Sequence, residues 1–185
     1  ATTLNDIPKL LDIELHLGIS GTKPGRVFEL ATHLVLGKLR KEPLTLKARL
    51  LDRGYADAEF TIPVFVFKNF STQHFGDIPV LEKGKYYVPT FPTQAAGDSG
   101  FFIPEKVLSK LFPHLGIPED SERWAFILVQ ATVADSQPVS EAGIDAIIQK
   151  VYNADHNASF FIMFCLPASR YHQQHHHYQQ RQKLS

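Results

Sequence analysis

Residues 124–133, WAFILVQATV, form the stretch that decides the fold. Its apolar residues run unbroken from Ala125 to Val129, which predicts a central β-strand covered on both faces. Gln130 and Thr132 interrupt this run near its C-terminal end. Because side chains alternate along a strand, these two polar residues lie on the same face.

The segments that follow this strand predict how it is covered. Residues 140–152 have a helical pattern, and residues 159–166 form a second apolar run that predicts a strand. The apolar face of the helix consists of Ile144, Ile147, Ile148 and Val151. A strand, a helix and a strand in this order predict a right-handed crossover and a parallel strand pair.

The segments before the central strand predict further helices and strands. Residues 18–25 contain several glycines and predict a loop, after which residues 26–39 predict a helix. The face that we expect this helix to bury consists of Val27, Leu30, Leu34 and Val35. Strands are predicted at residues 45–51, 60–70, 85–88 and 101–103, and a short helix at residues 105–111 with Pro104 at its first position.

Length and composition predict one ordinary α/β domain, in which helices flank a mixed sheet. The chain has 185 residues, of which 44% are hydrophobic and 21% are charged, so it can bury a core. No apolar run reaches the roughly 18 residues that a membrane span needs, and we expect no membrane partner. We assign residues 1–21 to an N-terminal segment, residues 22–169 to the domain, and residues 170–185 to a Gln/His-rich tail that we expect to be disordered.

Basic residues gather in the first half of the chain, although the formal net charge is zero. Residues 23–53 hold eight lysines and arginines against three acidic residues. Such a block can bind phosphate groups, and it can equally be a solvated surface. The candidate nucleic-acid-binding residues are Arg26, Lys47, Arg49 and Lys68.

Two motifs suggest chemistry that the rest of the sequence does not support. The run GDSG at residues 97–100 matches the nucleophile motif of chymotrypsin-like proteases, for which His33 and Asp57 are the available partners. His33, however, lies in a helical pattern, and the chain between it and Ser99 is too short for a double barrel. The histidines of residues 172–177 could bind metal only adventitiously, because nothing rigid holds them.

A third set of residues is more consistent with a site. Glu29 lies on the first predicted helix, Asp98 precedes a strand, and Gln130 and Thr132 end the central strand. A buried polar pair needs partners, and carboxylate and amide oxygens suit Mg²⁺, which can promote hydrolysis. The alternative is that Gln130 and Thr132 only form hydrogen bonds to a loop.

Short motifs along the chain occur in a recognisable order. They are GRVFE at 25–29, YVP at 87–89 with FP at 91–92, DS at 98–99 before FF at 101–102, LVQATV at 128–133, PV at 138–139 before AGI at 142–144, and FFIMFCLP at 160–167. This ordered set resembles the nuclease-type domain of the Crinkler effectors and the retrotransposon hot spot proteins. The resemblance covers roughly residues 22–174.

The resemblance implies a restriction-endonuclease-like fold of the PD-(D/E)XK type, with the order helix, strands, helix, strand. It implies Mg²⁺- or Mn²⁺-dependent DNA hydrolysis by a secreted effector that acts in a host nucleus, with DNA and host nuclear proteins as partners. Glu29 would be the helix acid and Asp98 the central metal ligand. Gln130 would replace the second acid as a ligand, and Thr132 would replace the usual lysine.

The sequence departs from this family at two points, and these keep other functions open. Gln137 stands where family members often carry histidine, so a general acid or base is missing. The central strand has no lysine, so water activation would depend on the metal, Lys68 or Lys150. The alternatives are a catalytically degenerate module that binds protein or DNA, and an interaction domain of unrelated fold.

Overall fold

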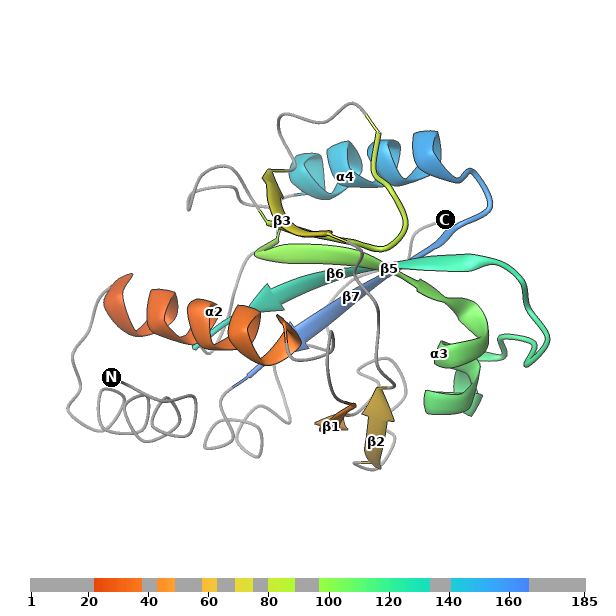
Figure 1. The fold of residues 1–185 in the computed structure, drawn as a ribbon, viewed down its shortest axis with the longest axis horizontal. Coiled ribbons are helices and arrows are strands. Elements are labelled where there is room, and N and C mark those ends of the chain that lie inside the picture. Colours follow the sequence, from red (N-terminus) through yellow and green to blue (C-terminus); the bar gives the residue numbers. More distant parts are fainter. Residues whose placement is uncertain are drawn as a thin grey trace.

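The main feature of the computed structural model, which describes residues 22–37, 43–48, 58–62, 69–74, 80–88, 97–133 and 141–166, is a five-stranded sheet (Figure 1). Its strands, in spatial order, are β3 (Asn69–His74), β4 (Lys85–Val88), β5 (Ser99–Pro104), β6 (Trp124–Ala131) and β7 (Ser159–Cys165). Neighbours β4–β5 and β5–β6 are antiparallel, whereas β3–β4 and β6–β7 are parallel. The predicted α/β class with a mixed sheet is therefore confirmed.

Strand β6 has the central role that its sequence predicts. Every residue from Ala125 to Ala131 is buried. Helix α4 (Glu141–Ala154) follows it along the chain and leads to β7, which pairs with β6 in parallel from Ala125↔Ser159 to Ala131↔Cys165. The predicted helix is confirmed, and so are the predicted final strand and its parallel pairing with β6.

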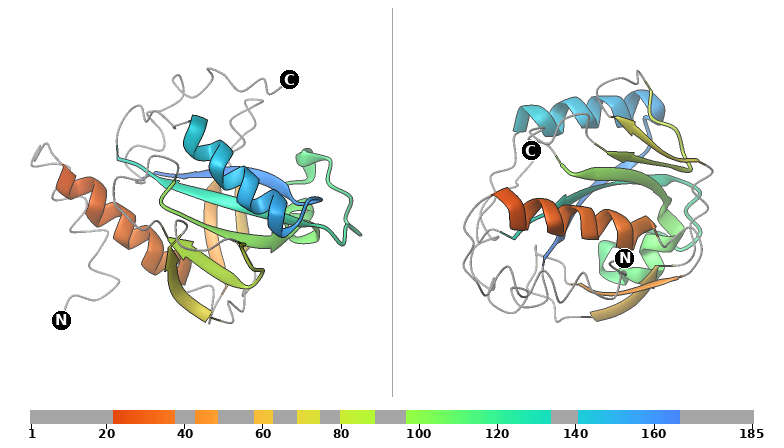
Figure 2. Two further views of the ribbon diagram at one scale, coloured as in Figure 1. Left: turned by 90° about the horizontal axis from the view of Figure 1, so that it is seen from above. Right: turned by 60° about the vertical axis from the view of Figure 1, so that its left-hand side comes forward.

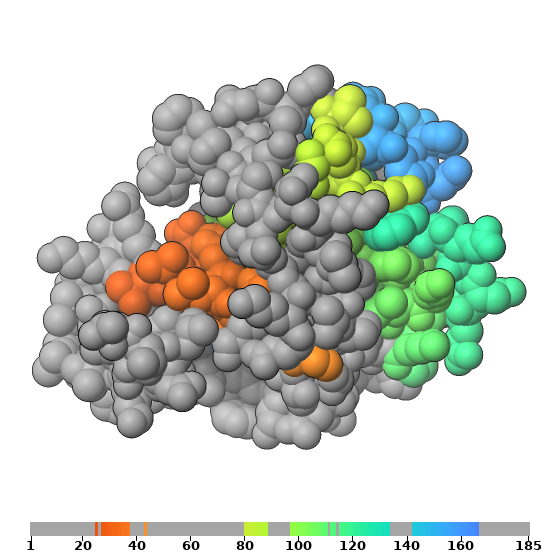
Figure 3. Space-filling model, viewed as in Figure 1, coloured from red at the N-terminus to blue at the C-terminus, as the bar shows by residue number. Residues whose placement is uncertain are grey.

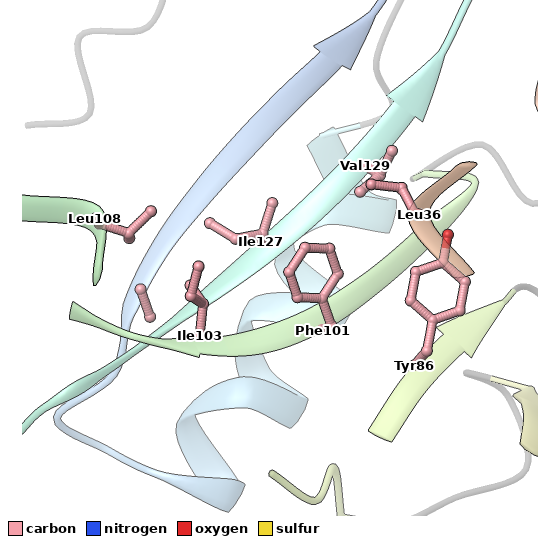
Figure 4. Close-up of a cluster of buried hydrophobic side chains, with 8 residues drawn as sticks. Leu36, Tyr86, Phe101, Ile103, Leu108, Ile127 and Val129 are labelled. Carbon is pink, nitrogen blue, oxygen red and sulfur yellow. The ribbon is translucent and has the colours of Figure 1, made fainter. Parts of the chain in front are cut away.

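Helices cover the two faces of the sheet (Figures 1 and 2). Helices α2 (Thr22–Gly37) and α3 (Glu105–Leu111) contribute Leu36 and Leu108 to one core, and α4 contributes to the other. The first core, drawn in Figure 4, is made of Leu36, Tyr86, Phe101, Ile103, Leu108, Ala125, Ile127 and Val129. The second is made of Leu81, Tyr87, Phe102, Phe126, Leu128, Ile144, Ile147 and Val151. Within the described part of the chain, no helix is both long and apolar enough to cross a membrane.

Helix α2 differs from its prediction in both its start and its buried face. It begins at Thr22, inside the predicted loop. Pro24 lies in its first turn, where a helix accepts proline. Two residues of the predicted buried face are exposed, Leu30 at 59% and Leu34 at 41%. The face that is buried lies one residue further along and includes Phe28, Ala31, Thr32 and Leu36. Part of α2 is accordingly at the surface in Figure 3.

The strand predicted at residues 60–70 is wrong as a single element. Its ends belong to β2 (Ala58–Ile62) and β3, which lie in different sheets, and residues 63–68 are outside the described part. Strand β2 pairs antiparallel with β1 (Leu44–Ala48) in a separate two-stranded sheet. Apolar content alone cannot show where one strand stops and another begins. The short helix at 105–111 is confirmed, but Pro104 ends β5 instead of beginning that helix.

A buried carboxylate ties α3 to β6 and β7 at one end of the sheet. The side chain of Glu105 is 0% exposed and accepts hydrogen bonds from Ser159 Oγ (2.5 Å), Ser121 Oγ (2.7 Å) and Arg123 Nε (3.0 Å). Burial raises the pKa of Glu105, but these hydrogen bonds and the charge of Arg123 outweigh burial and lower it. The carboxylate is therefore stabilised in its charged form, as expected of a structural group.

Candidate functional site

Asp98 and Gln130 meet at the other end of the same strands. The backbone N–H of Asp98 donates to the carbonyl of Val129 (2.8 Å), which fixes the chain just before β5. The Oδ2 atom of Asp98 then accepts the backbone N–H of Ala131 (2.5 Å) and a long hydrogen bond from Gln130 Nε2 (3.4 Å). Antiparallel pairing of β5 and β6 thus brings together residues that lie 32 positions apart in the sequence.

Gly97 allows this close approach. It is buried, and a Cβ atom added there would lie 2.8 Å from Cγ and 2.5 Å from Cδ1 of Leu128. Leu128 is fully buried in the core beneath α4, so it has little room to move. The absence of a side chain at position 97 therefore helps to set the position of Asp98.

Helix α2 brings Glu29 to this end of the sheet. Its residues Phe28 and Ala31 are buried against Ala131, next to Gln130. The pKa of Asp98 is raised to about 6, mainly because the carboxyl group is partly buried. The hydrogen bond from the Ala131 N–H and the charge of His33 lower this pKa, whereas the Glu29 carboxylate raises it further. The charges of Glu29 and His33 therefore both act on Asp98, in opposite directions.

His33 belongs to the same site, although the sequence indicated it only as a protease base. Its Nδ1 atom lies 2.9 Å from the hydroxyl of Tyr86, which donates to Ser99 Oγ at 2.7 Å. Its Nε2 atom lies 3.6 Å from Oε1 of Glu29, one helical turn earlier. The phenol of Tyr86 thus lies between His33 and Ser99, and Ser99 itself is fully buried. This arrangement is not that of a protease, in which the base contacts an accessible serine.

Thr132 and Gln130 are buried, as the sequence predicts, with exposures of 3% and 4%. The backbone N–H of Thr132 donates to the carbonyl of Cys165 (3.0 Å), which continues the pairing of β6 with β7. Burial raises the pKa of the Cys165 thiol to about 12, so this thiol stays protonated and unreactive.

The predicted phosphate-binding residues are not described. Arg49, Lys68 and Gln137 lie outside the described residues, as do the side chains of Arg26 and Lys47.

The donors that the structure does place at this site are oxygen-rich. Asp98 and Glu29 supply carboxylates, Gln130 an amide and His33 an imidazole. Among the residues that the structure describes, no three His, Cys, Asp or Glu side chains form a group that could hold a metal ion by themselves. Carboxylate and amide oxygens suit a hard divalent cation that keeps several waters.

No known family model matches the chain, and neither a characterised protein nor a solved structure matches it.

Proposed function

We propose that this chain is a restriction-endonuclease-like domain that hydrolyses DNA phosphodiesters with a divalent cation, Mg²⁺ or Mn²⁺, held at Asp98. The observation that carries this proposal is the meeting of Asp98 and Gln130 at adjacent strand ends, with the Glu29 carboxylate close enough to raise the pKa of Asp98. Like charges that converge in a partly buried place are costly unless a cation balances them.

The order of the elements supports the same fold type. The resemblance to the Crinkler and retrotransposon hot spot nucleases implies a helix, strands, a helix and a strand. Here α2, the strands β1 to β6 with the short helix α3 between β5 and β6, α4 and β7 follow along the chain, and β7 is parallel to β6. Asp98 precedes β5 and Gln130 lies near the end of β6, where that resemblance places the metal ligands.

The residues present fit an oxygen-preferring cation. Asp98 and Glu29 would hold it, and Gln130 would offer its amide oxygen, since the two ends of an amide are interchangeable by rotation. The cation would supply Lewis-acid stabilisation of the charge that develops on the phosphate. The chain itself orients the carboxylate of Asp98 through the backbone N–H of Ala131.

A second function, binding without hydrolysis, is supported by one observation. Gln130 donates its amide hydrogen to Asp98, so an uncharged side chain stands where an acidic ligand would otherwise be. Thr132 stands where such a nuclease would carry lysine and is buried. A site with these two substitutions could retain the fold and bind DNA or protein without cleaving it.

Nicking of supercoiled plasmid DNA separates the two functions. The full chain is incubated with plasmid and Mg²⁺ or Mn²⁺, beside Asp98→Asn and Glu29→Gln, and beside Asp120→Asn as a control for an exposed acid far from the site. A nuclease nicks the plasmid only with metal, loses nicking in the first two variants and keeps it in the third.

Two outcomes would contradict the nuclease proposal. One is the absence of nicking with either metal by folded protein, and the other is nicking that Asp98→Asn leaves unchanged. A gel-shift with the same plasmid then tests the second function. Binding that depends on Asp98 or Glu29 would support a degenerate binding site.

A further inference from the structure

Strand β7 is an edge of the five-stranded sheet. Among the strands that the structure describes, it pairs with β6 alone, and Figure 2 shows it at the rim of the sheet beside β6. The backbone N–H and C=O groups along the outer side of an edge strand can pair with a further strand. The rim at β7 is therefore a surface to which another strand can be added.

One hydrogen bond identifies the backbone groups of β7 that point away from β6. The carbonyl of Cys165 accepts the backbone N–H of Thr132 at 3.0 Å, so the backbone of Cys165 faces β6. Backbone groups alternate sides along a strand, so Phe161 also faces β6, whereas Phe160 and Ile162 face outward. Within the described part of the chain, no group donates to or accepts from the outward backbone groups of Phe160 and Ile162. These groups can therefore pair with a second strand.

The composition of β7 favours such pairing. Its sequence, SFFIMFC, contains no charged residue, no proline and no glycine, and its register with β6 runs without a bulge over all seven residues. Proteins that keep an edge strand unpaired place charges, proline or a bulge there. All seven residues of β7 are half-buried, so apolar side chains remain partly exposed along the whole strand.

Helix α4 is centred over the inner strands of the sheet. Beneath it, β4, β5 and β6 contribute the fully buried Tyr87, Phe102 and Phe126, whereas β7 contributes only the partly buried Phe160 and Ile162. A strand from another molecule can therefore approach the rim of β7 without displacing α4.

A second copy of β7 has the chemistry that this rim accepts. In two antiparallel copies related by a two-fold axis at Phe161, Phe160 of each strand lies opposite Ile162 of the other. Residues opposite each other with their backbone groups facing inward exchange both N–H···O bonds, so the outward groups of Phe160 and Ile162 are all satisfied. Neither strand is charged and the formal net charge of the chain is zero, so two copies meet without like-charge repulsion.

We propose that two copies of this chain dimerise at β7 and join their sheets through antiparallel pairing of the two strands. The inference goes beyond the metal-dependent function proposed above and does not depend on it, since no residue of β7 belongs to the candidate site at Asp98 and Glu29. The contact is one strand wide, which is smaller than the interfaces of permanent dimers. We therefore expect a dimer that dissociates on dilution.

Amide hydrogen exchange followed by NMR tests the pairing in the unmodified chain. The amide of Phe161 faces β6 and should exchange slowly at every protein concentration. The amides of Phe160 and Ile162 face outward, and we expect their exchange to slow by about tenfold when most chains are paired. Light scattering from the same samples should show the mass rising from the 20.8 kDa of one chain toward twice that value.

Two substitutions at Ile162 test the contact itself. Ile162→Pro removes an N–H that points away from β6, so it preserves the pairing with β6 and removes a hydrogen bond from the dimer. Ile162→Lys keeps this N–H and brings a positive charge from each chain to the contact. Both variants should keep the wild-type circular dichroism spectrum and the mass of one chain. Leu30→Lys is the control, because Leu30 is 59% exposed on α2, and this variant should still dimerise.

Four outcomes would overturn the inference. The first is a wild-type chain that keeps the mass of one chain at every concentration, and the second is exchange at Phe160 and Ile162 that does not change with concentration. The third is a dimer that persists in folded Ile162→Lys. The fourth is a dimer that Leu30→Lys abolishes and the Ile162 variants retain, which would place the contact on α2.

Discussion

Replacement of Asp98 by asparagine should stabilise the metal-free protein while abolishing the proposed metal-dependent nicking of DNA. The carboxylate lies partly buried next to Glu29, and burial raises the pKa of Asp98 from 3.8 to about 6. At about 1.4 kcal/mol per pKa unit, its ionised form costs the fold up to roughly 3 kcal/mol. Because the side chain is partly exposed, we expect about 1–2 kcal/mol. Asparagine keeps an oxygen for the Ala131 N–H and removes the charge.

The pH dependence of this effect follows from the sign of the shift. A raised pKa means that the folded state holds the proton of Asp98 more tightly than the unfolded state does. The wild type is therefore free of this cost below pH 3.8, and the cost grows as the pH rises from 3.8 to about 6 and then stays constant. The advantage of Asp98→Asn should be largest near pH 8 and should shrink toward pH 4.

Urea unfolding in EDTA measures the difference. Trp124, the only tryptophan of the chain, is half-buried at the start of β6 and provides the fluorescence signal. Asp120→Asn should change neither stability nor its pH profile. A variant Asp98→Asn that is less stable than the wild type at pH 8 would refute the inference that the ionised Asp98 destabilises the fold. An equal difference in unfolding free energy between variant and wild type at pH 4 and pH 8 would refute it as well.

Three further changes test the packing around the site. Glu105→Gln should lower the free energy of unfolding by about 1.5–3 kcal/mol at pH 7. Because the pKa of Glu105 is lowered from 4.5, urea titrations should show this loss shrinking as the pH falls from 4.5 through the lowered pKa. Gly97→Ala should cost about 1–3 kcal/mol and weaken Mn²⁺ binding measured by calorimetry, because the new methyl group meets Leu128. Leu34→Ser should change stability by less than about 0.5 kcal/mol while Leu36→Ala costs about 2–4 kcal/mol, and equal losses in the two would contradict the orientation of α2.

The central strand, α4 and the last strand were predictable because their patterns admit one interpretation. Residues 125–129 are apolar without interruption, so that strand can only be covered on both faces. The isoleucines and the valine of α4 recur on one side of the helix, and Ile144, Ile147 and Val151 are buried as predicted. A parallel neighbour for β6 then follows from the strand–helix–strand order.

The buried face of α2 could not be predicted because two apolar faces compete in its sequence. The face with Leu30 and Leu34 is more hydrophobic, and yet the face with Ala31 and Thr32 is buried. Thr32 tolerates burial because its hydroxyl donates to the carbonyl of Phe28 at 2.9 Å. Side-chain hydrogen bonds of this kind do not appear in a hydrophobic pattern, so apolar periodicity selects the wrong face.

The contacts of His33 and Tyr86 were likewise hidden in the sequence. They depend on strand register, because Tyr86 pairs with Phe101 and thereby brings its hydroxyl to Ser99, on the same face of β5. Residues 86 and 99 carry no motif that relates them. Asp98, Gln130 and Glu29 were singled out by the polar break in the central strand and by the family resemblance, and their role stays a prediction.

Two carboxylates at opposite ends of the same strands show why Asp98, and not Glu105, is the functional candidate. Glu105 is fully buried, but the hydrogen bonds it accepts lower its pKa, so its charge stabilises the fold. Asp98 is less buried, but its pKa is raised and its neighbour Glu29 is another acid. Carboxylates whose pKa is raised in this way cluster at functional sites, where proteins keep them at a cost in stability. A cation bound between Asp98 and α2 would turn that cost into binding energy, and it is this difference between the two acids that favours a metal-dependent function.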